Sequence, residues 1–329
     1  MRASVIGGGT WGSAFAIYLG RLNVETQIWI REQDIFDEAQ KSRENKVFLP
    51  GVVFPPSVSF FNEIEGALRS TEIVFIAVHS KFCRKIYEKI APFLSSNQII
   101  VSLTKGIEEN SLKRMSEIME EVFTQAPGIA VLSGPSFAKE VIEEHPTAVV
   151  MASKDLELAR KVQHFISSLY FRAYASKDII GVELCGALKN VIAIAAGISN
   201  SLEFGHNSMA ALITRGLAEM SRLGLKMGAE NQTFAGLAGM GDLVLTCTGE
   251  LSRNRYIGVE LGKGKSLEEI TSEMKMIAEG ITTTLSVHQL ANREKIEMPI
   301  CEKVYQVLYK NKNPKTALQE LLSRKLKDE

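Results

Sequence analysis

A glycine-rich turn near the start of the chain limits the available folds more than any other feature. Gly7, Gly9 and Gly12 form a G-x-G-x-x-G pattern, with the short apolar run 3–6 before it and a stretch of helical spacing, 13–21, after it. In this strand, turn and helix arrangement, the glycines allow a tight turn, close approach of a pyrophosphate, and close packing of helix on strand. The pattern therefore predicts a dinucleotide-binding unit.

Alternating strand and helix patterns continue through the first half of the chain. Apolar runs predict strands at residues 26–30, 73–78, 99–103, 129–132 and 148–151. Amphipathic stretches separate several of these runs. Such alternation is typical of a mostly parallel sheet with helices on both faces. We therefore predict an α/β fold that begins with a doubly wound, Rossmann-type sheet.

The pattern changes near residues 176–182. Beyond this point the segments become long, rich in alanine and leucine, and helical, and residues 182–198 are apolar on nearly all sides, as in a buried helix. A chain of 329 residues is also long for one hydrophobic core. We expect a dinucleotide-binding domain, residues 1–181, followed by an all-helical substrate and catalytic domain, residues 182–329.

Further helices are predicted in the second domain. Ser208 is a suitable N-cap for a helix over residues 209–223, and Gly224 is a suitable stop. Two more helices are expected over residues 266–278 and 299–309.

Composition excludes several classes of protein. Lysine plus arginine and aspartate plus glutamate both total 38, so no net field attracts nucleic acid or an anionic membrane. Apolar runs stay shorter than the roughly 18 residues that suggest a membrane span, and the N-terminus lacks a signal-peptide core. The histidines and cysteines lack metal-ligand spacing. We expect a cytoplasmic protein without nucleic-acid partner, membrane insertion or metal, with reduced thiols at Cys83, Cys185, Cys247 and Cys301.

A lysine inside the most apolar helix is the strongest candidate for chemistry. Lys189 has Cys185, Gly186 and Ala193 on the same helical face, and these small residues leave room for a ligand. Burial would bring the pKa of this amine towards neutrality, which suits an acid/base catalyst in ketone reduction. The alternative is a structural ion pair with Glu183 or Asp242.

Two loops at predicted strand ends are candidates for ligand contacts. Lys105 follows the strand over 99–103, and ligands of open α/β sheets lie beyond the carboxyl ends of strands. Residues 132–138 lead from a strand into a helix whose first turn would carry Pro135, which makes an anion-friendly start. An exposed lysine and a plain helix cap at Ser136 are the alternatives.

Glycines, hydroxyls and guanidinium groups gather in the second half, at residues 239–243 and 246–255. The planar guanidinium of Arg253 suits a phosphate better than a lysine does. We assign Arg253 and Asn254 to a substrate phosphate, and a charged surface loop is the alternative.

The end of the second predicted strand bears on which dinucleotide is bound. An acid at this point normally contacts the ribose 2′-hydroxyl of NAD, whereas a cation accommodates the 2′-phosphate of NADP. Arg31 stands at the expected position and Glu32 follows it. We expect NADP(H) to be favoured, with NAD(H) also used if Glu32 takes over. A solvated arginine is the alternative interpretation.

Taken together, these segments make the whole chain resemble the bacterial NAD(P)-dependent glycerol-3-phosphate dehydrogenases. The segments that carry the similarity are 7–12, 104–106, 133–140, 186–191, 239–243 and 252–255. Jointly they are specific, whereas the first alone is not. The resemblance implies the reversible reduction of dihydroxyacetone phosphate to sn-glycerol 3-phosphate with NADP(H) and/or NAD(H). It also implies a cytoplasmic homodimer whose product feeds phospholipid synthesis.

The resemblance also implies roles for single residues. Lys189 corresponds to the proton donor or acceptor. The positions that correspond to substrate contacts are Lys105, Gly134, Ser136, Lys189, Asn190, Asp242, Thr246, Ser252, Arg253 and Asn254. Cofactor contacts are expected from the glycine loop and from the family's other positions, which together are Gly7, Gly9, Thr10, Trp11, Gly12, Arg31, Lys105, Ala138, Arg253, Ile277 and Glu279.

Two other interpretations stay open. A hydroxyacid or 6-phosphogluconate dehydrogenase would share the glycine loop and a helical domain, but residues 239–243 and 252–255 count against it. A cofactor-sensing protein without catalytic activity would have no need for Lys189 in a pocket of small residues.

Overall fold

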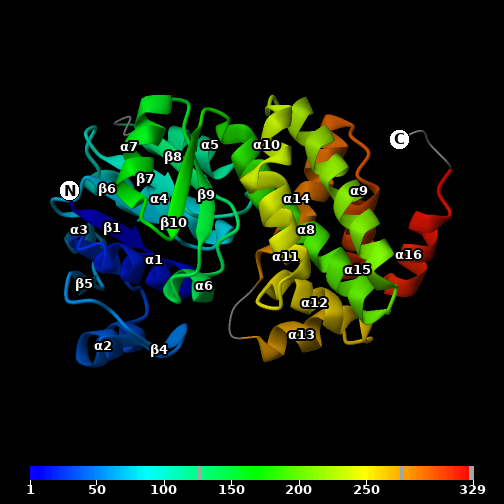
Figure 1. Ribbon diagram of the computed structural model, residues 1–329, viewed down its shortest axis with the longest axis horizontal. Helices are drawn as coiled ribbons and strands as arrows, with labels where there is room; N and C mark the ends of the chain where they lie inside the picture. Colours follow the sequence, from blue (N-terminus) through cyan, green and yellow to red (C-terminus); the bar gives the residue numbers. More distant parts are fainter. Residues whose placement is uncertain (125–127, 275–277, 326–329) are drawn as a thin grey trace. The chain divides into compact units, whose positions relative to one another are not determined.

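The computed structural model describes residues 1–124, 128–274 and 278–325, and Figure 1 shows its helices and strands. They fall into two compact units. The first unit comprises Met1–Lys105 and Arg114–Val182, and the second comprises Gly106–Lys113 and Glu183–Glu329.

The first unit is built on an eight-stranded sheet. Its strand order is β10-β9-β8-β7-β6-β1-β2-β5, and neighbouring strands are parallel except β8 and β9. The strands are β1 (Ala3–Ile6), β2 (Thr26–Trp29), β5 (Val58–Phe61), β6 (Ile73–Ile76), β7 (Ile99–Ser102), β8 (Gly128–Ser133), β9 (Thr147–Ala152) and β10 (Phe171–Ser176). The predicted mostly parallel, Rossmann-type sheet is therefore confirmed.

Helices cover both faces of this sheet, which is why every residue of β1, β6 and β7 is buried. One face packs on α1, where the rings of Phe15, Tyr18 and Phe171 are in contact. The other face packs on α4 and α5 through residues such as Ile86 and Ile118. The helices of this unit are α1 (Thr10–Arg21), α2 (Gln33–Ser42), α3 (Ile64–Leu68), α4 (Cys83–Ile90), α5 (Met115–Val122), α6 (Ala138–Ile142) and α7 (Leu156–Ile166).

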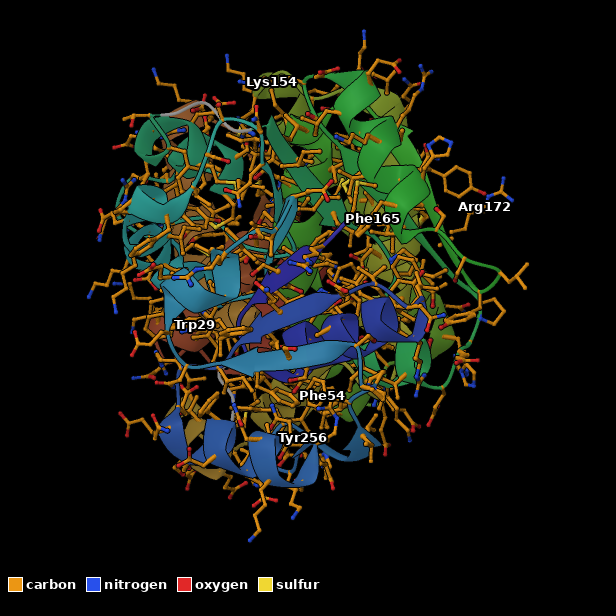
Figure 2. All side chains as sticks on the ribbon, turned by 90° about the vertical axis from the view of Figure 1, so that its left-hand side faces the viewer. Trp29, Phe54, Lys154, Phe165, Arg172 and Tyr256 are labelled. Carbon is orange, nitrogen blue, oxygen red and sulfur yellow. The ribbon has the colours of Figure 1, made fainter. Side chains whose placement is uncertain are left out.

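Sequence patterns missed the two edge strands, β5 and β10. In β10, Phe171 and Ala173 are buried, whereas Arg172 and Tyr174 are exposed and lie together in a cation–π contact of 5.2 Å. Figure 2 shows Arg172 at the outer surface of the sheet. Because an edge strand has a solvated side, it shows no continuous apolar run. The small antiparallel ribbon of β3 (Glu44–Asn45) and β4 (Leu49–Val53) was also unexpected.

Within residues 183–325 the described elements of the second unit are all helices, as predicted (Figure 1), whereas its segment 106–113 is not helical. Its longest helix, α8 (Ile179–Ser201), is long and apolar enough to cross a membrane, yet 89% of its most apolar stretch is buried. We therefore describe α8 as the core helix of this unit. The others are α9 (Gly205–Lys226), α10 (Asn231–Ala235), a π-helical turn (Leu237–Gly241), α11 (Asp242–Thr248), α12 (Arg253–Gly262), α13 (Leu267–Glu273), α14 (Glu279–Glu294), α15 (Pro299–Tyr309) and α16 (Pro314–Leu322).

The predicted ends of α9 were wrong. Both Ser208 and Gly224 lie inside this helix. A Cβ atom at Gly224 would come within 2.1 Å of the Phe234 ring, so this glycine allows close packing of α10 rather than ending the helix. The glycine that follows the helix in a left-handed conformation is Gly228, with φ of 92°.

Of the two other helices predicted in this unit, one has different bounds from those expected and one has the expected bounds. The helix expected over residues 266–278 is shorter than predicted, because α13 begins after the N-cap Ser266 and ends at Glu273. The bounds predicted for α15, residues 299–309, are confirmed.

Candidate active site

The glycine loop of the first unit has the geometry that its sequence pattern requires. Gly7 has a φ of 127°, and a Cβ atom there would lie 2.5 Å from the carbonyl oxygen of Ala77. At Gly12 a Cβ atom would lie 1.9 Å from the carbonyl oxygen of Gly7, so both positions exclude other residues. A Cβ atom at Gly9, in contrast, would have no neighbouring atom of the described residues within 4 Å. The loop is therefore tightly packed at Gly7 and Gly12 and has open space beside Gly9.

Gly9 is also the N-cap of α1, and no side chain from the described residues caps this helix. The first N–H groups of a helix carry a partial positive charge and bind phosphate groups well. The open space at Gly9 and the uncapped helix start together fit the pyrophosphate of a dinucleotide. Thr10 and Trp11, two of the expected cofactor contacts, form the first turn of this helix.

A buried asparagine that sequence reasoning missed supports the loop. The Asn45 side chain is fully buried and donates hydrogen bonds to the carbonyl oxygen of Gly8, at 2.7 Å, and to Ser13 Oγ, at 3.0 Å. Thr10 Oγ1 donates to the carbonyl oxygen of Phe48, at 3.0 Å. The segment 45–48 therefore holds the glycine loop from outside its own motif, and no local sequence signal marks it.

Arg31 lies two residues beyond β2 and is held by its neighbours. Its side chain is 60% exposed, and its Nε donates to Glu32 Oε1 at 2.9 Å. The guanidinium carbon lies 5.9 Å from the centre of the Phe82 ring. Glu32 therefore partly neutralises the cation, and the aromatic ring restricts where it can point.

The structure brings together three predicted substrate contacts in the first unit. Lys105 Nζ donates to the carbonyl oxygen of Gly134 at 2.8 Å, and Ser136 Oγ donates to the same oxygen at 2.9 Å. Gly134 has a φ of 134°, and a Cβ atom there would lie 2.9 Å from the Cα of Val149. The three residues therefore form one small cluster, with Lys105 partly buried at its centre.

The helix that follows this cluster begins later than expected. The N-cap of α6 is Phe137, and Ala138 is the first helical residue. Pro135 therefore lies before the helix and not in its first turn, so that prediction was wrong. Positive φ at Gly134 turns the chain away from helical geometry at the point where the prediction placed a helix start.

In the second unit, Lys189 is buried and paired. Only 6% of the residue is exposed, and its Nζ lies 2.5 Å from Asp242 Oδ1 and 2.8 Å from Thr246 Oγ1. Thr246 Oγ1 in turn donates to the carbonyl oxygen of Asp242 at 2.6 Å. Of the two partners considered from sequence, Asp242 is therefore the acceptor that the structure places against the amine.

This pairing has a clear electrostatic consequence. Burial disfavours the charged ammonium, whereas the Asp242 carboxylate, itself 0% exposed, favours it. The pair therefore places an amine beside a carboxylate in a position that excludes bulk water. An ammonium so placed is both a proton donor and a source of positive charge for an oxygen that becomes negative.

The glycine-rich segment before Asp242 sets the position of its carboxylate. Residues Leu237–Gly241 form a π-helical turn, an irregularity often found at functional sites. A Cβ atom at Gly239 would lie 2.2 Å from the carbonyl oxygen of Phe234, so the tight turn needs glycine there. Asp242 is the first residue of α11, which continues directly from this turn.

Asn190 and Asn254 are brought together, but their amide groups are used within the protein. Asn254 Nδ2 donates to Asn190 Oδ1 at 2.9 Å, and Asn254 Oδ1 accepts a hydrogen bond from the N–H of Gly280 at 2.9 Å. This network ties α8, α12 and α14 to one another. Both residues therefore position neighbouring elements, whatever else they contact.

Three further predicted residues lie at the starts of α12 and α14. Ser252 is the N-cap of α12, and its Oγ accepts a hydrogen bond from the N–H of Arg255. Arg253 follows it and is exposed. The surrounding protein atoms lower the pKa of Arg253, and the nearby Glu279 carboxylate opposes this shift. Ile277 lies outside the described residues.

Arg255 ends the segment 252–255, and the sequence analysis assigned it no role. Its Nε is buried without a hydrogen-bond partner among the described residues. Burial raises the pKa of the neighbouring Cys247 thiol to about 12, while the charges of Lys189 and Arg255 oppose that shift. Two cations therefore act on this buried thiol, which stays protonated.

The fold and these residues define a class of protein. A Rossmann-type unit with an open glycine loop, together with a helical unit that buries a lysine–carboxylate pair, is typical of NAD(P)-dependent oxidoreductases with two domains.

Comparison with known proteins gives the particular family. Residues 2–159 match the model for the N-terminus, and residues 178–319 the model for the C-terminus, of NAD-dependent glycerol-3-phosphate dehydrogenase. The chain therefore belongs to the NAD-dependent glycerol-3-phosphate dehydrogenase family.

Individual relatives agree along the whole chain. The chain is 50% identical to a glycerol-3-phosphate dehydrogenase [NAD(P)+] of Citrifermentans bemidjiense, covering 100% of this chain and 98% of the relative. It is 48% identical to that of Geobacter sulfurreducens, with the same coverage. A crystal structure of glycerol-3-phosphate dehydrogenase from Coxiella burnetii has a TM-score of 0.95 at 38% identity, covering 98% of this chain and 99% of that one.

Proposed function

We propose that this protein reduces dihydroxyacetone phosphate to sn-glycerol 3-phosphate, reversibly, with NADPH or NADH. The observation that carries the proposal is the buried Lys189, held by Asp242 and Thr246. The open glycine loop of a dinucleotide-binding unit supports it, as does the chain's family.

Lys189 is the acid in the proposed reaction. The nicotinamide cofactor, when bound, supplies a hydride to the carbonyl carbon. As the carbonyl oxygen becomes negative, the Lys189 ammonium donates a proton to it, so that a secondary alcohol forms. In the reverse direction the neutral amine takes the proton back. Asp242 and Thr246 hold the amine in one position, which removes the cost of orienting it during the reaction.

The phosphate group of the substrate needs cationic and hydroxyl partners. We assign its binding to Arg253, whose guanidinium is exposed at the start of α12, with Ser252 and Asn254 beside it. The cluster of Lys105, Gly134 and Ser136 is assigned to the substrate as well. Asn254 also has the positioning role described above, because its amide joins Asn190 and Gly280.

Cofactor binding is assigned to residues 1–181, and substrate binding and proton transfer mainly to residues 182–329. Within the first domain the glycine loop takes the pyrophosphate, and Arg31 takes the 2′-phosphate of NADPH. We further propose that the cofactor contacts are completed by Glu279, Ile277, Arg253, Ala138 and Lys105.

Three wider properties belong to the same proposal. The protein acts in the cytoplasm, it works as a homodimer, and its product enters phospholipid synthesis. The equal totals of basic and acidic residues agree with a small phosphorylated substrate captured by local groups.

One assay tests the reaction and the phosphate assignment together. NADPH or NADH absorbance is followed with dihydroxyacetone phosphate and, separately, with unphosphorylated dihydroxyacetone. We expect rapid oxidation only with the phosphate ester. Equal rates with both compounds would remove Arg253 from its role, and no oxidation with either would favour a cofactor-sensing protein without catalytic activity.

A further inference from the structure

A groove of about 840 Å³ in the second unit has no part in the proposed reaction. Its lining residues come mainly from α9, α15 and α16, and a few come from α8. The groove-lining residues recur every three or four positions, as on one face of a helix, at 208, 211, 212, 215, 219 and 222 on α9 and at 314, 317, 318, 321 and 322 on α16. Both α9 and α16 pack on α15, and Figure 1 shows the three helices in the same part of the second unit.

The walls of this groove are mainly apolar. Leu212, Val304, Val307 and Leu318 line it, together with Leu322, which is 77% exposed. A volume of this size, lined mostly by apolar side chains with a few charged ones, is typical of a site for a small ligand. Apolar side chains recur along α15, a helix of 11 residues and roughly 16 Å, and this length suits an extended hydrocarbon chain.

Charged residues gather where α15 begins. Glu219 on α9 accepts hydrogen bonds from the N–H groups of Ile300, at 2.7 Å, and Cys301, at 3.2 Å, so the later part of α9 lies beside the start of α15. Glu297 forms an ion pair with Arg324, with 3.2 Å between Glu297 Oε2 and Arg324 Nη2. Both glutamates that line the groove are therefore already bonded within the protein.

The cations that line the groove outnumber these two glutamates. They are Arg215, Arg222, Lys295, Lys303, Arg324 and Lys325. Lys303 is paired with Glu320, and Arg324 with Glu297. Lys295 is exposed and has no ion pair among the described residues. A groove with this charge favours an anionic occupant.

An adjoining depression of about 380 Å³ shares Lys295 and Arg324 with the groove and is also lined by His288 and Glu302. This depression gives a charged headgroup room beside the apolar walls.

We propose that the groove binds one long-chain fatty acid, with its hydrocarbon chain along α15 and its carboxylate at Lys295 and Arg324. The proposal does not depend on the dehydrogenase reaction, because no residue of the proposed active site lines the groove.

Calorimetric titration of the full-length protein with saturated fatty acids of eight to fourteen carbons tests the proposal, at concentrations below micelle formation. We expect one molecule bound per chain. The affinity should rise by about fourfold for each added methylene until the groove is full. Binding that does not depend on chain length, or that appears only at micellar concentrations, would overturn the proposal.

Two matched pairs of variants locate the binding. Ala211→Trp fills the groove, whereas Ala210→Trp places the same ring on the exposed side of the same helix. Lys295→Gln removes a cation at the charged end, and Lys226→Gln removes an exposed cation outside the groove. We expect losses of at least tenfold for Ala211→Trp and several-fold for Lys295→Gln, with both controls like the parent.

Analytical sedimentation of the same proteins measures their oligomeric state and so tests the alternative that a second copy of the chain covers the groove. If a second copy covers the groove, Ala211→Trp will split the dimer and the parent protein will bind no fatty acid. That result overturns the proposal, as does equal binding by Ala211→Trp and Ala210→Trp. An oligomeric state unchanged by Ala211→Trp, with fatty-acid binding lost, supports it.

Discussion

The amine of Lys189 lies 2.5 Å from Asp242 Oδ1, in a part of the second unit where both residues are almost completely buried. The two are 53 positions apart in the sequence and are carried by α8 and α11. A buried ion pair can serve stability, catalysis or both, and the two roles make different predictions.

Loss of the amine should abolish turnover and leave cofactor binding intact. Lys189→Ala removes the proton donor, so kcat should fall at least about a hundredfold, the usual scale of acid/base catalysis. Fluorescence titration with NADPH should give an affinity close to that of the parent protein. A kcat near the parent value would reduce Lys189 to a structural residue.

Removal of both charges should restore stability but not activity. Lys189→Met and Asp242→Asn each leave one buried charge without its partner, which costs about 3–5 kcal/mol. The double variant leaves no charge and should regain most of that free energy of unfolding, measured by urea titration. Its turnover should stay as low as that of Lys189→Met. Recovered turnover in the double variant would exclude the amine as the acid.

Gly9 and Gly12 should respond differently to the same substitution. The space beside Gly9 is open, so Gly9→Ala should fold normally but weaken dinucleotide binding at least tenfold, because its methyl group occupies the place of the pyrophosphate. Gly12→Ala would put a methyl group 1.9 Å from a carbonyl oxygen, so it should lower the thermal midpoint or prevent folding. Unchanged NADPH affinity in a folded Gly9→Ala protein would contradict the assigned role of the loop.

The charge at residue 31 should influence the choice of cofactor. Arg31→Asp replaces the cation beside Glu32 with a second acid, which repels a 2′-phosphate and accepts a hydrogen bond from a 2′-hydroxyl. The ratio of kcat/KM for NADPH to that for NADH should fall by at least tenfold. Lys81→Asp, on the short turn next to Phe82, is a control of equal charge change. An equal shift in that control would mean that general charge, and not contact, sets the preference.

The buried glutamate of α9 should make stability depend on pH. Burial raises the pKa of Glu219 from 4.5 to about 7. Because the folded state holds the proton more tightly than the unfolded chain, the protonated group contributes stability that is complete below pH 4.5 and is lost as pH rises through about 7.

Glu219→Gln tests this prediction, because the amide stays neutral and its oxygen can still accept a hydrogen bond from Ile300. At pH 8 the variant should be more stable than the parent, by up to about 3 kcal/mol, whereas at pH 4.5 the two should be similar. Calorimetric scans at both pH values measure the difference. A variant that is less stable at both would show that the carboxyl group is needed for its hydrogen bonds alone.

Much of the first unit was predictable because its signals are local. Three glycines at fixed spacing and apolar runs such as 73–76 and 99–102 report a turn and central strands, since strands buried on both faces need apolar residues throughout. Edge strands lack that requirement, and β10 was therefore missed. The short segment that carries Asn45 was missed for a related reason, because its contacts with Gly8 and Ser13 lie more than thirty positions away.

The sequence could indicate which residues belong to the candidate site, but not which hydrogen bonds and ion pairs they form. A lysine inside an apolar helix is unusual at the level of sequence, because an unpaired buried charge is costly. Sequence alone could not choose between Glu183 and Asp242 as its partner, since only packing of α11 on the core decides which carboxylate reaches the amine. Nor could it show that Asn254 is bonded to Asn190 and Gly280.

The sequence by itself determined the dinucleotide-binding turn, the central strands of the sheet, and the residue types available for proton transfer, because each depends on neighbours along the chain. The tertiary structure decided which groups meet. It paired Lys189 with Asp242, set Gly224 against Phe234 where a helix end was expected, and buried Glu219 at the start of α15. Those outcomes depend on side chains distant in sequence coming within a few ångströms, which no local pattern records.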